Sequence, residues 1–294
     1  MSVHVLRDVR KAFQNLNPGE VRELAERPLR IGVLAVDDAL YSRAISFLIP
    51  THTSDAKAAQ AARCVARMGS EEDLAQCDLG LSESGLPHPP HFYAFDMHEP
   101  AAVIRPILDD HEDLWIPLAQ RFLPFREPVI ERVIWKISKE NAFFAVATGV
   151  PNVVPSLLSL PWAAGEFASD TAFLTMNQVR MAFLIAAASD STIGYREQRA
   201  QIGSIVAAAF GWRAIARELV SKIPAGGGLL SKGLVAFAGT YAVGVSLDRF
   251  LRLGRGLTRA EKKQHYDDAW VRGRAAVQQI IDRLTKRTVT VRGV

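Results

Sequence analysis

The chain has little cysteine and no recognisable export signal. Among its 294 residues only Cys64 and Cys77 are cysteines, and no CxxC pair is present, so neither a disulfide framework nor a zinc ribbon is supported. The opening residues, MSVHVLRDVRKAF, are charged from the seventh position and lack the apolar stretch of a secretory signal. These absences predict a protein of a reduced, cytoplasmic compartment.

The motifs of nucleotide hydrolysis are also missing. A phosphate loop needs glycines, a lysine and a Ser or Thr where the first strand meets the first helix. The apolar run at 29–36 predicts that strand, but the following segment reads AVDDALYSRA, and the carboxylates of Asp37 and Asp38 would repel phosphate there. The sequence contains neither a D-x-x-G nor an N-K-x-D motif. We therefore expect no cofactor and no GTP hydrolysis.

Histidines gather in one region without a metal-binding pattern. His88, His91 and His98 lie close to Asp96 and Glu99, residue types that ligate metals. Prolines interleave them, however, and neither HExxH nor facial-triad spacing is present. A loop with surface histidines is the stronger interpretation, so we predict no metal site and no catalytic residue.

The first third of the chain predicts a small α/β domain. Short apolar runs at 29–36, 77–81 and 92–95 are typical of buried strands, and the segments 37–48 and 101–108 have helical character. This start is the one that nucleotide-binding domains have. The predicted organisation is an N-terminal helical segment at 1–27, a degenerate P-loop or Rossmann-like parallel-sheet domain at 28–110, and a mostly helical domain, rich in small apolar residues, at 111–294.

Two long stretches of the helical domain lack charge altogether. Residues 141–165 carry no charged side chain and are long enough to cross a bilayer, but three prolines interrupt them, which argues against one straight spanning helix. In the second stretch, 233–247, the small residues Ala236, Thr240 and Gly244 recur every four positions. That spacing predicts a close helix contact, either within the chain or between copies of it. Lipid contact and soluble packing both stay open for the two stretches.

The basic charge of the chain is concentrated at its end. From residue 249 onward Lys and Arg exceed Asp and Glu by eight, although the whole chain has a net charge of only +4. Thr258 and Glu261 form a capping box that predicts the start of a final amphipathic helix. These cations could form a simple solvated surface, or they could bind anionic lipid or a partner protein. Nucleic acid ranks below lipid. The candidate lipid or partner face comprises Arg249, Arg252, Arg255, Lys262 and Lys263.

One resemblance covers residues 129–281. The pair Asn177-Gln178 before an apolar helix, then Gly194-Tyr195, then Ile223-Pro224 with glycines, and finally the segment AGTYAVG at 238–244 resemble the YcjF-like helical domain that follows Era-like GTPase domains in bacteria. The resemblance implies a location at the cytoplasmic face of the membrane and assigns no catalytic residue. It also implies that the domain at 28–110 is a degenerate, pseudo-GTPase-like domain.

These observations favour a non-enzymatic, membrane-associated adaptor or scaffold that holds an unknown protein partner and docks on the membrane or forms a homo-oligomer. An enzyme or nucleotide binder with an unconventional site, around Asp37, Asp38 and residues 88–98, is the alternative. A soluble helical scaffold without membrane contact is the third interpretation.

Overall fold

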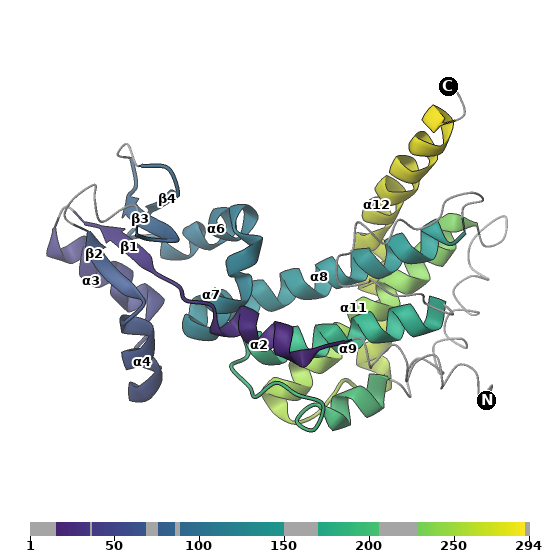
Figure 1. Cartoon of the computed structure of the whole chain (residues 1–294), viewed down its shortest axis with the longest axis horizontal. Coiled ribbons are helices and arrows are strands. Elements are labelled where there is room, and N and C mark those ends of the chain that lie inside the picture. Colours follow the sequence, from purple (N-terminus) through teal and green to yellow (C-terminus); the bar gives the residue numbers. More distant parts are fainter. Residues whose placement is uncertain are drawn as a thin grey trace. The chain divides into compact units, whose positions relative to one another are not determined.

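The protein consists of two compact units. The computed structural model describes residues 16–35, 37–68, 76–85, 89–149, 170–205 and 228–291. The α/β unit comprises Gly19–Glu131 and Ala186–Thr192, and the helical unit comprises the described parts of Met1–Pro18, Arg132–Ile185 and Ile193–Val294. A small parallel sheet and a helical remainder (Figure 1) confirm the predicted combination of an α/β and a helical part. Residues 111–131, grouped with the helical domain on sequence grounds, belong to the α/β unit.

The elements of the α/β unit follow the apolar runs of the sequence. Predicted strands at 29–36, 77–81 and 92–95 are confirmed, and one further strand, Val65–Met68, was missed. Pro18 takes the first position of the first helix, where its missing amide is not needed. In order, the elements are α2 (Pro18–Glu26), β1 (Ile31–Leu34), α3 (Asp38–Leu48), α4 (Asp55–Ala62), β2 (Val65–Met68), β3 (Leu79–Glu83), β4 (Phe92–Phe95), η1 (Pro100–Val103), α6 (Ile104–Asp110), η2 (Glu112–Leu114) and α7 (Trp115–Arg121).

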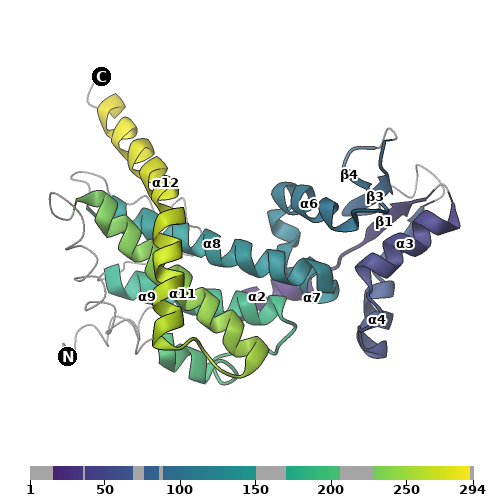
Figure 2. The ribbon, with the colours of Figure 1, turned by 180° about the vertical axis from the view of Figure 1, so that it is seen from behind.

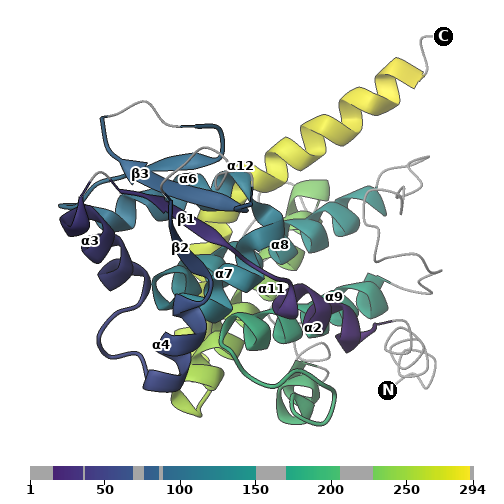
Figure 3. The ribbon, with the colours of Figure 1, turned by 60° about the vertical axis from the view of Figure 1, so that its left-hand side comes forward.

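The sheet is parallel throughout, with strand order β2-β1-β3-β4. Strand β1 lies between β2 and β3 (Figure 3). Ile31 of β1 pairs with Val65 of β2 on one side and with Leu79 of β3 on the other. The chain passes from β1 to β2 on one side and then to β3 on the opposite side, so the strand order reverses next to β1. In open α/β sheets, ligands bind at the carboxyl ends of the strands at such a reversal. A ligand-binding site is therefore expected at the carboxyl end of β1.

Close packing of β3 against β4 explains one glycine of the sheet. A Cβ on Gly80 would lie 2.1 Å from Cε1 of Phe92, so the Phe92 ring occupies the space above Gly80. Phe95, at the other end of β4, is fully buried, and its ring centroid lies 5.8 Å from that of Phe47 in α3. Aromatic side chains thus attach β4 both to its neighbouring strand and to α3.

Four long helices build most of the described helical unit. Their bounds are α8 (Leu123–Ala147), whose first residues lie in the α/β unit, α9 (Asp170–Ala188), α11 (Leu229–Leu253) and α12 (Arg259–Val291). Helix α12 runs back along α11 (Figures 1 and 2). Glycines set the distance between these two helices: a Cβ on Gly273 of α12 would lie 2.4 Å from Cδ1 of Phe237, and one on Gly233 of α11 would lie 2.5 Å from Cγ1 of Val277. Each helix therefore receives a large side chain of the other over a glycine.

Candidate functional site

Two carboxylates lie between the carboxyl end of β1 and the first turn of α3. Asp37 follows β1 and has extended backbone angles, and its Oδ1 accepts a hydrogen bond of 2.8 Å from the amide of Leu40. Asp38 begins α3, and its carboxylate pairs with the Arg67 guanidinium from β2. The same guanidinium lies over the ring of Tyr41, 5.4 Å from its centroid.

The N-terminus of a helix normally attracts negatively charged groups. Its free amides and the positive end of the helix dipole bind anions such as phosphate. Here the Asp37 carboxylate occupies one of those amides, and Asp38 places a second negative charge in the first turn. The carboxyl end of β1 is thus already supplied with its own anions.

Asp37→Ala is expected to lower the free energy of unfolding by about 1 kcal/mol, because it removes the N-cap hydrogen bond of α3. Asp37→Asn keeps an acceptor and should lose much less. Asp38→Ala serves as the neighbouring control, since it removes an exposed ion pair of about 0.5 kcal/mol or less. Urea unfolding of the three variants measures the difference, and equal losses at positions 37 and 38 would count against the cap.

The histidine-rich segment forms a polar turn in the described part of the chain. Asp96 Oδ1 accepts the amides of His98 at 2.7 Å and Glu99 at 3.4 Å, and these backbone hydrogen bonds hold the pKa of Asp96 below its usual value. His91 has a positive φ of 63°, and its ring lies 6.1 Å from that of His111. His88 lies outside the described residues.

The described part of this segment contains no cluster of metal-ligating side chains. Among the described residues no group of three or more His, Cys, Asp or Glu side chains is arranged to hold a metal ion. The structure instead brings His91 and Tyr93 each next to His111, with ring centroids of Tyr93 and His111 5.8 Å apart. Tyr93 Oη in turn donates to Asp110 Oδ2 at 3.0 Å. These side chains connect β4 to the end of α6.

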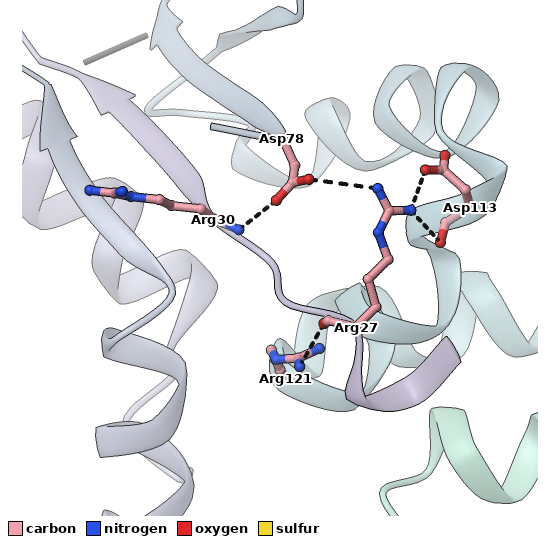
Figure 4. A network of polar contacts seen from close by, with 5 residues as sticks. All are labelled: Arg27, Arg30, Asp78, Asp113 and Arg121. Atoms are coloured by element: carbon pink, nitrogen blue, oxygen red, sulfur yellow. Dashed lines mark hydrogen bonds and ion pairs between the residues drawn. The ribbon is translucent and has the colours of Figure 1, made fainter. Parts of the chain in front are cut away.

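An arginine network lies at the opposite, amino-terminal edge of the sheet (Figure 4). The Arg27 guanidinium pairs with Asp113 and lies 3.7 Å from Asp78, which also accepts the amide of Arg30 at 2.8 Å. Arg121 donates to the backbone carbonyl of Arg27 at 2.9 Å. The Arg27 hydrogen bond holds the pKa of Asp113 below its usual value. The network fixes the segment between α2 and β1 against η2 and α7, and its partners are too far apart in sequence to be recognised as a pattern.

The core of the helical unit contains a buried polar cluster shared by three helices. Thr240 Oγ1 of α11 accepts hydrogen bonds from Asn141 of α8 at 2.7 Å and from Gln178 of α9 at 3.3 Å. Asn177 donates to Asn141 Oδ1 at 2.9 Å and to Glu140 at 3.2 Å. Buried hydrogen bonds of this kind are satisfied in only one alignment of the helices. The cluster therefore fixes the register of α8, α9 and α11.

The predicted small-residue seam lies in this core. Thr240 belongs to the polar cluster, and a Cβ on Gly244 would lie 2.8 Å from the Ile134 side chain of α8 and 3.0 Å from Met181 Sδ of α9. Ala236 is also buried. Thr240 and Gly244 thus contact helices of the same chain.

The turn between α11 and α12 is tightly braced. Gly254 ends α11 with a left-handed φ of 70°. Thr258 and Glu261 form the predicted capping box, in which the Thr258 amide donates a hydrogen bond of 2.8 Å to Glu261 Oε2. Arg249 pairs with Glu261 at 2.7 Å and is half-buried. The hydrogen bonds from the Thr258 amide and hydroxyl, together with Arg249, lower the pKa of Glu261 from 4.5 to about 2.

The capping box predicts a specific response to acid. Because the pKa of Glu261 is lower in the folded chain, its carboxylate contributes stability that is complete above about pH 4.5 and is lost as the pH falls towards about 2. The parent chain should therefore exceed Glu261→Gln in stability at about pH 6, and the difference should shrink to almost nothing near pH 2. Urea unfolding at intervals over this range measures it. A difference independent of pH would contradict the assigned role.

Four of the five predicted surface cations are exposed at this turn. Arg252, Arg255, Lys262 and Lys263 face solvent, whereas Arg249 is half-buried and paired with Glu261. Arg252 pairs with Asp248 one turn earlier in α11. Leu253, between the arginines, is 61% exposed, although sequence reasoning did not single it out. Its signal was available, since it is an apolar residue at the end of a helix between two basic ones.

Helix α11 is the one described helix whose length and composition would allow it to cross a membrane. Its mean hydropathy over 18 residues reaches 1.3, but 67% of that window is buried inside the protein. Core helices of soluble proteins meet the same criterion, so the finding is weak evidence for a span. Of the uncharged stretch 141–165, only the part up to Gly149 is described.

Comparisons of the chain with protein-family models, with curated proteins and with solved structures give no match.

Proposed function

We propose that this protein is a non-enzymatic adaptor or scaffold at the cytoplasmic face of a membrane. In this proposal the α/β unit is a degenerate, GTPase-like domain that holds a protein partner, and the helical unit is a YcjF-like module that docks on the membrane. The observation that carries the proposal is the capping of α3 by Asp37, because the carboxylate takes the place at which a phosphate group would bind.

The α/β unit has features that disfavour nucleotide binding and features that suit the binding of a partner protein. A nucleotide would have to displace Asp37 and approach Asp38, and no lysine or glycine-rich loop follows β1 to compensate for that repulsion. A parallel sheet without phosphate binding can still present loops and helix faces to a partner protein. The retained sheet and the occupied helix N-terminus together favour a binding role over hydrolysis.

Titration calorimetry of the full chain with Mg²⁺ and GTP, or with Mg²⁺ and ATP, tests the adaptor half. We expect no heat of binding at micromolar to millimolar nucleotide. Saturable heat that is reduced by Asp37→Lys or by removal of Mg²⁺ would support the alternative, a nucleotide binder with an unconventional site.

Cell fractionation tests the membrane half. We expect the protein to sediment with membranes at low ionic strength and to be released by high salt, as a surface-docked protein would be. The burial of α11 favours one competing interpretation, a soluble helical scaffold. Recovery of the whole protein in the soluble fraction at low salt would favour that scaffold, and resistance to both salt and carbonate would favour a spanning helix.

A further inference from the structure

The turn between α11 and α12 carries a surface that the internal packing of the helical unit does not explain. We call it the basic turn and define it as Arg252, Leu253, Arg255, Lys262 and Lys263. All five side chains are exposed. Leu253 stands out, because at 61% exposure it is one of only a few large apolar side chains facing solvent in the described chain. A single exposed leucine is ordinary on a protein surface, but this one lies within a group of exposed cations.

The charge around Leu253 is strongly positive. Residues 248–263 contain six Lys and Arg against two acidic residues. Both acids are engaged locally, Asp248 by Arg252 and Glu261 by Arg249 and the capping box. Among the described residues, Arg255, Lys262 and Lys263 have no acidic partner. The basic turn therefore presents net positive charge to its surroundings.

The backbone beneath these side chains is well fixed. Gly254 closes α11 in the left-handed conformation, Leu257 is buried, and its amide lies 3.4 Å from Ser246 Oγ. The Arg249–Glu261 pair joins the end of α11 to the start of α12. A surface held in this way loses little conformational freedom when it binds.

We propose that the basic turn is a docking surface for anionic phospholipids, with the cations at the headgroups and Leu253 inserted among the outer acyl chains. This inference rests on the proposed membrane function and specifies how the membrane is bound. Cations near an anionic leaflet, together with an apolar side chain that enters the boundary layer, are the two contributions that give peripheral proteins their affinity.

An acidic protein is the competing occupant. Protein interfaces gain most of their energy from clusters of buried apolar or aromatic side chains in pockets. The basic turn offers one exposed leucine among cations, which provides no such cluster. A bilayer, in contrast, accepts a single protruding leucine wherever it meets the surface. The observations thus favour lipid over protein.

Vesicle sedimentation with the full chain tests the inference. The wild-type protein should bind vesicles that contain phosphatidylglycerol and should not bind pure phosphatidylcholine vesicles. The triple variant Arg255→Glu, Lys262→Glu, Lys263→Glu should bind the anionic vesicles at least roughly tenfold more weakly. Leu253→Ser, which keeps every charge, should reduce binding by roughly threefold to tenfold.

A matched control separates local from global charge. Arg199, Arg274 and Arg283 are exposed elsewhere on the helical unit, so reversing all three changes the net charge of the chain by the same amount. This control should retain at least half of the wild-type affinity, and circular dichroism should show that all variants are folded. An equal loss in both triple variants, or no binding of the wild type to anionic vesicles, would overturn the inference.

The result also distinguishes this inference from the proposed function. If the wild type fails to bind anionic vesicles but still sediments with cell membranes, the basic turn is not the lipid surface, while the membrane location stands. If it also stays soluble in cells, the proposed membrane function fails as well.

Discussion

Gly273→Ala is expected to lower the free energy of unfolding by about 2 kcal/mol, because the added methyl group would collide with a buried ring. Its Cβ would lie 2.4 Å from Cδ1 of Phe237, which is fully buried. The Phe237 ring cannot withdraw, since it packs edge-on against Trp135 with centroids 4.9 Å apart. Urea unfolding of the full chain measures the loss.

A second background makes the explanation for Gly273 specific. Once Phe237→Ala has removed the ring, Gly273→Ala should leave the free energy of unfolding unchanged or raise it by up to about 1 kcal/mol, because alanine is the better helix former. Gly203→Ala is the control, since Gly203 is an exposed helical residue with open space around its Cβ position. If the change at 273 costs the same with and without the Phe237 ring, the proposed collision is not its cause.

Thr240→Val should destabilise the chain by about 2–3 kcal/mol, although the two side chains have nearly the same shape. Valine deletes the acceptor of Asn141 Nδ2 and Gln178 Nε2, and both of these donors are buried. A buried donor without a partner costs about 1–3 kcal/mol. The measurement is again urea unfolding.

The same substitution at an exposed site provides the reference for Thr240. Thr285 lies on the exposed side of α12, and its hydroxyl donates to the backbone carbonyls of Ile281 and Asp282 in the same helix. Thr285→Val should change stability by less than about 0.5 kcal/mol. Thr240→Ser, which keeps the hydroxyl, should retain most of the stability. Similar effects at positions 240 and 285 would show that the polar cluster does not hold the helices together.

The features that could be predicted from the sequence are those determined by neighbouring residues. The apolar run before Asp37 predicted β1, and the box formed by Thr258 and Glu261 predicted the start of α12. The strand Val65–Met68 was missed because it is short and contains Arg67, whose charge is balanced by Asp38 of α3. A short strand with a charged residue has no clear periodicity.

Features that depend on distant partners could not be predicted. The spacing of Thr240 and Gly244 indicated a close contact, but not that Asn141 and Ile134 of the same chain supply it. Likewise, the basic end of the chain was evident, yet the separation of half-buried Arg249 from the exposed cations follows from its ion pair with Glu261. These contacts link residues up to 99 positions apart, where local patterns carry no information.

Under the proposed function, this protein docks on membranes in the absence of a nucleotide. Sedimentation with phosphatidylglycerol vesicles, in the absence and presence of Mg²⁺ with GTP or ATP, tests this most directly. We predict that the same fraction of the wild-type protein is bound under all three conditions, because Asp37 occupies the helix terminus that would otherwise receive phosphate. A bound fraction that rises or falls with either nucleotide would contradict the account.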